Sequence, residues 1–380
     1  MKQASLDQIG LIISKVIENN PSLVYFQVNL LKTQLIGDKV FAGKEAVAEL
    51  YKTSYFGHPK DDMLELSLLE AAFLLSRRKL EIEIGGRIIN FKDFFEQASL
   101  KQQNFELKYI VYKDLKDRGY YVQPSAIDFR VYPRGSHPGK SAAKIFVRVQ
   151  SERQHLPVKI LQETVTASEN VHKQFILAVV DEEGDITFYE VKTEVPKGEM
   201  TLQLSTVKTY ATFLEDRVIS WDSKTSKTLY NKGFYGKMLD SEKLQLSLVE
   251  SLYLLSKGII TIRDRGSKVF SFDEFIEKAS EIESSFFRKY STYKNLRDSG
   301  HVVKTGFKFG THFRVYKKVE SIERIPHSEY LVNTIPTEFE FRLPVMSGAV
   351  RLANSVHKTM LFAVEKRDEI KYLNIGRIKM

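Results

Sequence analysis

The sequence contains no cysteine among its 380 residues. Disulfide bonds, thiolate metal sites and a cysteine nucleophile are therefore excluded. No stretch of about 18 apolar residues is present, and the first residues lack the apolar core of a secretory signal. We therefore expect a soluble, cytoplasmic protein with no membrane partner. Histidine is also scarce, with 8 residues, so each one in a suggestive context can be weighed individually.

Positive charge is in excess, with 57 Lys and Arg against 48 Asp and Glu and a formal net charge of +9. This excess favours a polyanionic partner such as nucleic acid, because Lys and Arg displace phosphate counterions. A generally basic surface is the alternative explanation. The hydrophobic fraction of 43% is enough for well-packed cores, and the length predicts two or more domains.

The chain repeats itself with a period of about 180 residues. The ordered series of matches predicts a tandem duplication, and we call the two halves copy one and copy two. The matching segments include LSLLEAAFLLSRRK (66–79) with LSLVESLYLLSK (246–257), YIVYKDLKDRGYYV (109–122) with YSTYKNLRDSGHVV (290–303), and SENVHKQFILAVV (168–180) with ANSVHKTMLFAVE (353–365).

Each copy is expected to fold as two α/β domains, so the fold class is mixed α/β. Apolar residues at helical spacing predict an amphipathic helix near 66–79 and near 246–257. Hairpins with a glycine turn are predicted at 79–91 and 259–272. The stretch PKGEMTLQ (196–203) is the expected linker between the copies. The predicted domains are 1–107 and 108–195 in copy one, and 200–287 and 288–380 in copy two.

The second domain of each copy should open with a helix that ends at Gly119 or Gly300, since glycine suits a helix C-cap. A sheet and a further helix should follow, and a hairpin should close the domain. The expected strands are FRVYP, IFVRV and PVKIL in copy one, and FRVYKK, EYLVNTI and FEFRLPV in copy two.

Three side chains of copy two have the chemistry needed to cut RNA through its 2′-hydroxyl. Tyr316 ends a predicted strand, His327 begins the next, and Lys358 lies in the predicted helix that follows. The reaction needs a base, an acid and a cation for the phosphate charge. Histidine suits acid work near neutral pH, and lysine binds phosphate oxygens. Tyrosine, with a free pKa of about 10, needs a strongly cationic site or must accept the proton as the reaction proceeds.

Structural explanations remain open for each of the three residues. A tyrosine at a strand end often packs in a core, a histidine before a strand is usually exposed, and a lysine late in a helix complements the helix dipole. Spacing alone is therefore a weak signal for a catalytic set.

Taken together, these phrases resemble the archaeal tRNA-splicing endonuclease family. The resemblance is carried by YKNLRDSGHVVKTGFKFGTHFRVY (293–316), HSEYLV (327–332) and SGAVRLANSVHK (347–358), with GFYGK and LSLVESLYLL similar to the family's N-terminal domain. It implies an N-terminal α/β domain and a nuclease-like α/β domain per copy. It also implies cleavage of precursor tRNA at bulge–helix–bulge junctions without metal or cofactor, leaving a 2′,3′-cyclic phosphate and a 5′-hydroxyl.

The resemblance also implies roles for individual residues. Tyr316 corresponds to the general base, His327 to the general acid and Lys358 to the group that stabilises the transition-state charge. Arg351 and Arg377 correspond to two arginines that sandwich a flipped-out bulge base, and guanidinium planes do stack on exposed bases.

Copy one departs from this pattern. Tyr132 and Lys173 are present, but the chain reads AAKIFV where HSEYLV is expected, so Ala142 or Ser141 replaces the histidine. His137 lies nearby and would reach the site only if its loop folded back. Copy one is therefore predicted to be a degenerate, structural copy.

Copy one carries an acidic turn that copy two lacks, formed by Asp181, Glu182, Glu183 and Asp185. The matching turn of copy two, EKRDE (365–369), is mixed in charge. A solvated hairpin tip is the simple explanation. In the family that the chain resembles, a similar loop inserts into a basic pocket on the opposite chain, which implies a homodimer.

Two other functions stay open. A metal-dependent nuclease of the restriction-enzyme type needs two or three converging carboxylates, and only Glu369-Ile370-Lys371 matches its acidic–x–Lys pattern. A non-catalytic RNA-binding assembly subunit is the other alternative. The complete set of Tyr316, His327 and Lys358 argues against it.

Overall fold

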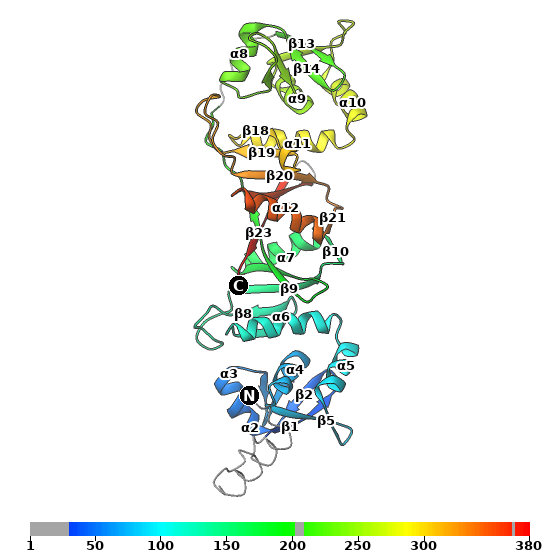
Figure 1. The fold of residues 1–380 in the computed structure, drawn as a ribbon, viewed down its shortest axis with the longest axis vertical. Coiled ribbons are helices and arrows are strands. Elements are labelled where there is room, and N and C mark those ends of the chain that lie inside the picture. Colours follow the sequence, from blue (N-terminus) through cyan, green and yellow to red (C-terminus); the bar gives the residue numbers. More distant parts are fainter. Residues whose placement is uncertain (1–29, 202–208, 367–368) are drawn as a thin grey trace, which may run out of the picture. The chain divides into compact units, whose positions relative to one another are not determined.

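A computed structural model describes residues 30–201, 209–366 and 369–380 (Figure 1). The start of the first predicted domain, the end of the predicted linker, and Arg367 and Asp368 of the mixed-charge turn lie outside the described residues. The chain divides into two units, Met1–Tyr109 and Ile110–Met380, which are taken separately below. No helix within the described residues combines the length and apolar character needed to span a bilayer.

The first unit contains a six-stranded sheet in the order β3-β4-β2-β1-β5-β6. Strands β1 and β5 pair in parallel, and the other neighbours are antiparallel. Helix α4 packs on the sheet and on α5, and a helical segment of α2, η1 and α3 precedes it. The elements are β1 (Leu31–Ile36), β2 (Lys39–Ala42), α2 (Lys44–Ala46), η1 (Val47–Tyr51), α3 (Lys52–Ser54), β3 (His58–Lys60), β4 (Met63–Ser67), α4 (Leu68–Ser76), β5 (Leu80–Ile84), β6 (Arg87–Ile89), α5 (Phe91–Lys101) and α6 (Phe105–Asp117), which runs on into the second unit.

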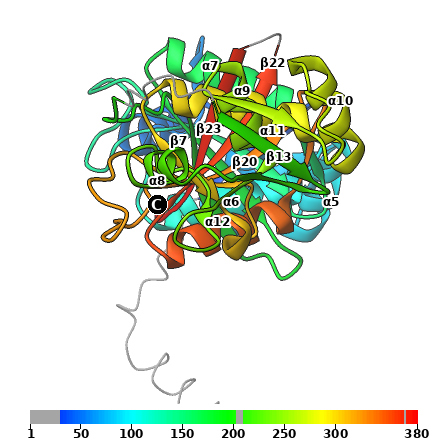
Figure 2. The same cartoon turned by 90° about the horizontal axis from the view of Figure 1, so that it is seen from above.

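The second unit is built on a ten-stranded sheet to which each copy contributes five strands. Its order is β18-β19-β20-β22-β23-β12-β11-β9-β8-β7, so the second half repeats the first in reverse. Strands β22 and β23 run side by side near the centre of Figure 2. The copy-one elements are β7 (Val122–Ser125), β8 (Asp128–Val131), β9 (Ile145–Ser151), β10 (His155–Pro157), α7 (Val158–Asn170), β11 (Gln174–Val180) and β12 (Ile186–Glu194). The copy-two elements are α11 (Phe286–Asp298), β18 (Val302–Thr305), η2 (Phe307–Phe309), β19 (Phe313–Tyr316), β20 (Tyr330–Ile335), β21 (Glu340–Arg342), α12 (Leu343–Ser355), β22 (Thr359–Lys366) and β23 (Glu369–Ile378).

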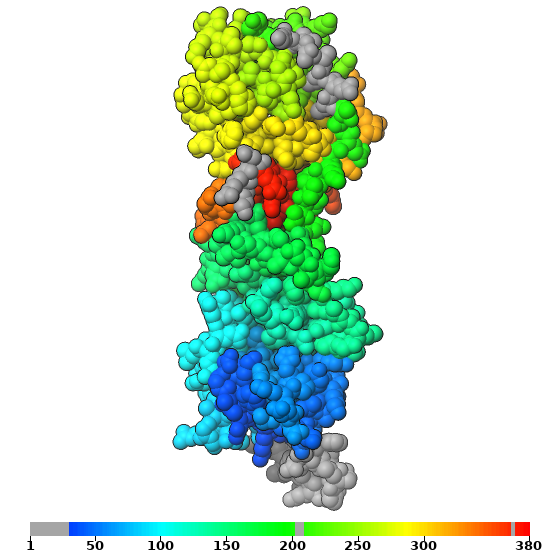
Figure 3. Space-filling model, turned by 180° about the vertical axis from the view of Figure 1, so that it is seen from behind, coloured from blue at the N-terminus to red at the C-terminus, as the bar shows by residue number. Residues whose placement is uncertain are grey.

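The two copies meet through equivalent residues. In the antiparallel pairing of β12 with β23, Val191 lies opposite Ile375, the residue that matches it in the repeat. In the small sheet of β10 and β21, Leu156 lies opposite its own counterpart, Phe341. Figure 3 shows β23, in red, against green segments of copy one. Contacts between equivalent residues define a local two-fold axis, as in a symmetric dimer. The predicted mixed α/β fold and the tandem duplication are therefore confirmed.

Both faces of this sheet are buried, as the near-continuous apolar strands predict. Along β22, Met360, Phe362 and Val364 join the core under α7 and α12, while Leu361 and Ala363 join the core under α11. The alternation follows the two-residue period of a strand. The sheet is therefore a rigid support for the residues at its edges.

Two predicted strands are wrong. PVKIL is helix after its first residue, because β10 ends at Pro157 and α7 begins at Val158. FEFRLPV is a strand only over Glu340–Arg342, because α12 begins at Leu343. The apolar residues of α12 recur at helical spacing, at Leu343, Met346 and Val350, and all three are buried. A short apolar run at the start of such a helix cannot be told from a strand by periodicity.

The first domain of copy two holds a five-stranded sheet in the order β15-β16-β14-β13-β17, with α9 and α10 packed on it. Its elements are β13 (Thr209–Leu214), β14 (Arg217–Ser220), α8 (Ser223–Asn231), β15 (Lys237–Met238), β16 (Leu244–Leu246), α9 (Leu248–Ser256), β17 (Ile260–Arg263) and α10 (Phe272–Ile282). Helix α9 is the predicted amphipathic helix, and Ser247 with Glu250 forms a capping box at its start.

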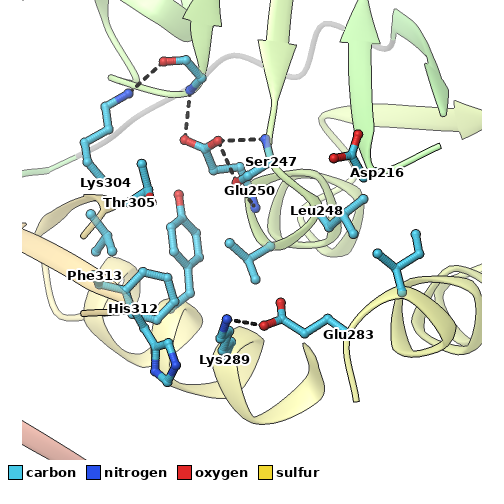
Figure 4. Close-up of a pocket in the computed structure, with 15 residues that line it drawn as sticks. Asp216, Ser247, Leu248, Glu250, Glu283, Lys289, Lys304, Thr305, His312 and Phe313 are labelled. Atoms are coloured by element: carbon cyan, nitrogen blue, oxygen red, sulfur yellow. Dashed lines mark hydrogen bonds and ion pairs between the residues drawn. The ribbon is translucent and has the colours of Figure 1, made fainter. Parts of the chain in front are cut away.

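The buried carboxylate of Glu250 organises the boundary with the second domain (Figure 4). It accepts hydrogen bonds from Gly236 N at 2.8 Å, Ser247 N at 3.0 Å and Ser247 Oγ at 2.8 Å. Lys304 of β18 donates to Gly236 O at 2.9 Å, and Arg297 of α11 donates to Gly233 O at 3.0 Å. The loop between α8 and β15 is thus held from both domains.

His312, just before β19, is fixed as a neutral imidazole. Its Nδ1 accepts a hydrogen bond from Thr334 N at 2.9 Å, which requires that nitrogen to be unprotonated. Burial lowers the pKa of His312 to about 4, the positive charges of Lys289 and Arg288 act in the same direction, and Glu283 opposes them. Protonation of Nδ1 would remove the hydrogen bond that ties His312 to β20.

We predict that Glu250→Gln destabilises the protein by about 1–3 kcal/mol, because the amide group must turn a donor toward one of the buried donors. Urea denaturation measures the change in unfolding free energy. Glu277→Gln, on the exposed face of α10, is the control and should have an effect below about 0.5 kcal/mol. Equal stabilities of the two variants would contradict the assigned role of Glu250.

We also predict that His312 makes the protein less stable as the pH falls from about 6.5 toward 4. In this window the unfolded chain binds a proton at His312 and the folded chain does not, so acid favours unfolding. Replacing His312 by Asn supplies a neutral acceptor and should flatten the dependence. Some slope should remain, because burial also lowers the pKa of His301. Urea midpoints measured across this pH range test the prediction, which fails if the slope of the Asn variant is unchanged.

Candidate active site

The strand arrangement brings the ends of three copy-two segments to one edge of the sheet. Strand β19 ends at Tyr316 and runs antiparallel to β20, with Val315 opposite Tyr330. Strands β20 and β22 are parallel neighbours, and Tyr330 lies opposite Thr359. Tyr316, His327 and Lys358 therefore all lie where β19 ends and where β20 and β22 begin.

Lys358 does not lie in a helix, contrary to the sequence prediction. Helix α12 ends at Ser355, and His357 adopts a left-handed conformation with φ of +54°. The bonds Lys358 N to Ala353 O and His357 N to Asn354 O, at 2.9 and 3.1 Å, form a Schellman motif. Because a histidine takes the position that glycine usually fills, the sequence did not signal the end of the helix.

The side chain of Lys358 points toward the segment that carries His327. Lys358 is 9% exposed, and its Nζ donates to Ser328 O, next to His327, at 3.1 Å. The ammonium also lies 5.9 Å from the centre of the Phe309 ring. An enclosed cation of this kind is suited to bind a phosphate oxygen.

Tyr316 is held in a small apolar cluster. Its ring is 3% exposed and packs with Phe234 of the first domain, Val302 and Val319, with Met200 beside them. Burial raises the pKa of the Tyr316 phenol, Arg314 opposes the shift and Glu329 adds to it. The side chain is therefore well fixed in place and keeps its proton at neutral pH.

His327 is exposed and lies in the loop before β20, which begins at Tyr330 rather than at His327 as expected. Exposure leaves its imidazole accessible to a substrate. The phrase HSEY also holds a residue that sequence analysis overlooked. Glu329 accepts a hydrogen bond from Lys317 N at 2.8 Å and so ties the end of β19 to the start of β20.

Copy one keeps the backbone of this region and the tyrosine and lysine, but not the histidine. His172 also has φ of +54°, and Lys173 N bonds Ser168 O at 2.8 Å, so the Schellman motif is repeated. The Tyr132 hydroxyl donates to Gln123 Oε1 at 2.8 Å. His137 Nδ1 lies 2.8 Å from Pro138 O, and Ala142 or Ser141 stands where copy two has its histidine.

Arg351 of α12 and Arg377 of β23 line one cavity of about 300 Å³. Both side chains are exposed, and neither guanidinium forms a hydrogen bond or ion pair with the residues that the structure describes. Tyr189 and Ser347 also line the cavity and are joined by a hydrogen bond of 2.8 Å. The predicted arginine pair is thus brought together and left free to bind a ligand.

The acidic turn of copy one lines the same cavity, which the sequence did not indicate. Asp181 and Asp185 contribute to the lining. Asp181 Oδ1 accepts bonds from Glu183 N at 3.0 Å and Asp185 N at 2.8 Å, and so shapes the turn. Glu182 forms an ion pair with Arg153 at 2.5 Å.

No group of three His, Asp or Glu side chains is placed to hold a metal ion within residues 30–201, 209–366 and 369–380. Glu369 and Lys371, the acidic–x–Lys match, lie in β23.

Comparison with known proteins identifies both domains in both copies. The model of the tRNA intron endonuclease catalytic C-terminal domain matches residues 105–188 and 286–372. The model of the tRNA intron endonuclease N-terminal domain matches residues 31–95 and 209–276.

Relatives from archaea match over nearly the whole chain. The tRNA-splicing endonuclease of Methanosarcina mazei is 76% identical over 353 residues, which is 93% of this chain and 100% of the relative. That of Methanosarcina barkeri is 79% identical over 350 residues, 92% of this chain and 100% of the relative. That of Methanococcoides burtonii is 55% identical over 351 residues, 92% of this chain and 100% of the relative. The chain therefore belongs to the tRNA intron endonuclease family and is an endoribonuclease that carries both domains of the family twice.

Proposed function

We propose that copy two cleaves precursor tRNA at both intron–exon junctions, at bulge–helix–bulge structures, by attack of the 2′-hydroxyl and without a metal ion. The products are a 2′,3′-cyclic phosphate and a 5′-hydroxyl. The proposal is supported by the position of three chain segments, because the end of β19 with Tyr316, the loop with His327 and the residue before β22, Lys358, lie at the same end of neighbouring strands. The names of the relatives support the substrate class.

Each of the three side chains has one task. Tyr316 removes the proton of the 2′-hydroxyl, whose oxygen then attacks the phosphorus. His327 gives a proton to the departing 5′-oxygen, and Lys358 stabilises the negative charge that grows on the phosphoryl oxygens. Burial raises the pKa of Tyr316, so little of its phenol is ionised at neutral pH, and Arg314 is the neighbouring charge that favours the phenolate.

Arg351 and Arg377 hold a flipped-out base of the bulge between their guanidinium planes. Their shared cavity and their lack of partners among the described residues support this role. Binding an unpaired base in a fixed position would orient the neighbouring phosphate for cleavage.

Copy one serves as a structural partner. The division into domains 1–107, 108–195, 200–287 and 288–380 is part of this proposal, and the matched family ranges support it. Two chains form a homodimer, so that two catalytic copies serve two junctions. The acidic turn of each chain docks on copy two of the other through its tip, Glu182 and Glu183, while Asp185 at the base of the turn lines the arginine cavity of its own chain.

The cavity of Figure 4, about 530 Å³, is the candidate receptor for this turn, although it is not the uniformly basic pocket that the resemblance implies. Its lining is mixed in charge, with Lys289 and Lys304 facing Asp216, Glu250 and Glu283. Glu283 pairs with Lys289, and Glu250 accepts three hydrogen bonds from its own domain. Within the described residues, the Lys304 ammonium has a carbonyl partner and no carboxylate, and burial lowers its pKa. A carboxylate from a second chain would neutralise it.

We predict that His327→Ala slows single-turnover cleavage of a bulge–helix–bulge RNA by about 100-fold or more, because the leaving oxygen loses its acid. RNA affinity should stay nearly unchanged, as measured by equilibrium binding. His137→Ala in copy one is the matched control and should cleave at the normal rate. A large loss of cleavage rate in His137→Ala, with none in His327→Ala, would show that copy one and not copy two cleaves the RNA.

We predict that reversing the charge at the tip of the acidic turn, with Glu182→Lys and Glu183→Lys, converts the dimer to monomers. These two residues are chosen because Asp181 holds the turn itself together. Sedimentation equilibrium gives the mass. Glu277→Lys, an exposed carboxylate on α10, should leave the mass at that of two chains. A double variant of unchanged mass would rule out docking through this turn.

A further inference from the structure

Two cavities of the second unit occupy equivalent positions about the local two-fold axis. The arginine cavity lies between α12 and β23 of copy two and the β11–β12 hairpin of copy one. The second cavity lies between α7 and β12 of copy one and the β22–β23 hairpin of copy two. In the repeat, Arg351 corresponds to Thr166 and Arg377 to Thr193, and both threonines line the second cavity, which we call the threonine cavity. The protein therefore contains two cavities at equivalent positions, of about 300 and 860 Å³, and only the smaller one is lined by arginines at these two positions.

The arginine cavity has a second chemical feature, a group of carboxylates opposite the arginines. Glu152, Asp181 and Asp185 of copy one line it. No ion pair within 4 Å joins them to Arg351 or Arg377 in the part of the chain that the structure describes, although opposite charges face one cavity. The space between them has room for a small ring ligand.

Two of the three carboxylates are already engaged with the backbone. Asp181 Oδ1 accepts the two N–H bonds of its own turn, and Glu152 Oε1 accepts Glu182 N at 3.1 Å. The carboxylate of Asp185 is exposed and has no hydrogen-bond or ion-pair partner among the described residues. Asp185 is therefore the one carboxylate of the three with neither oxygen engaged by a described residue, so both of its oxygens can accept from a ligand.

We propose that Asp185 reads the base held between Arg351 and Arg377 by accepting a hydrogen bond from its exocyclic amino group. The pocket then selects amino-bearing bases, cytosine or adenine, over uracil at the flipped-out position. This inference rests on the base-binding role of the arginines in the proposed function. It assigns to copy one a specificity-determining residue for the reaction that copy two performs.

The physical basis is the difference between the base edges. The arginines contribute stacking, which every base offers, and so do not discriminate. An ionised carboxylate is an acceptor only. Cytosine presents an amino donor where uracil presents a carbonyl acceptor, so a carboxylate bonds the first and repels the second. Asp and Glu carboxylates are known to accept a hydrogen bond from the N4 amino group of cytosine.

The test compares four proteins on matched bulge–helix–bulge RNAs that carry cytosine or uracil at the flipped-out position. The native chain should cleave the cytosine RNA about tenfold faster than the uracil RNA at subsaturating protein. Asp185→Ala should bring the ratio close to one. Asp185→Asn should shift the preference toward uracil, because its amide can donate to the carbonyl, and loss of fold or of dimer would not produce such a reversal. Glu338→Ala, which removes a carboxylate from the threonine cavity, should keep the native ratio.

Equilibrium binding of the same two RNAs by the His327→Ala chain separates this inference from the catalytic proposal, because it requires no cleavage. The same preference should appear in the dissociation constants. A native ratio near one, or a preference that survives in both Asp185 variants, would overturn the assignment of Asp185. If Arg351→Ala leaves both cleavage and binding unchanged, the base-binding role itself fails instead.

Discussion

The antiparallel pairing of β12 with β23 is the contact on which the rest of the structure depends. It joins the two copies into one ten-stranded sheet and removes one exposed strand edge from each. Its register places Val191 opposite Ile375. As a result, the β11–β12 hairpin of copy one lies beside α12 of copy two, and the β22–β23 hairpin of copy two lies beside α7 of copy one. A slip of one residue would turn the side chains of these strands to the opposite face and would dismantle both cavities beside the axis.

Within this symmetric frame the two copies have different side chains, and the differences follow a division of labour. The backbone that positions Lys358 is repeated at Lys173, including the left-handed histidine before each lysine. Copy one has no histidine at the position of His327, and it has threonines where copy two has Arg351 and Arg377. In return it supplies the acidic turn, whose Asp181 and Asp185 complete a cavity that belongs chemically to copy two. This cavity is thus lined by residues of both copies.

The duplication and several helix ends could be predicted from the sequence, because each follows from a pattern of nearby residues or from the repeat itself. The capping box of Ser247 and Glu250 and the glycine after α11 mark helix ends by known chemistry, and the repeat revealed the duplication. The sequence predicts a helix through Lys358, whereas α12 ends at Ser355, because His357 takes the left-handed position that glycine normally fills. The meeting of Asp185 with Arg351 and Arg377 was not predictable, because it depends on a register between strands about 180 residues apart in the chain. No periodicity in either copy encodes that pairing.

The central claim is that copy two cuts RNA with side chains alone. The most direct measurement is single-turnover cleavage of a bulge–helix–bulge RNA in EDTA, followed by identification of the new ends. The account predicts an unchanged rate and products that carry a 2′,3′-cyclic phosphate and a 5′-hydroxyl. Loss of cleavage in EDTA, restored by Mg²⁺ and giving 5′-phosphate ends, would contradict it.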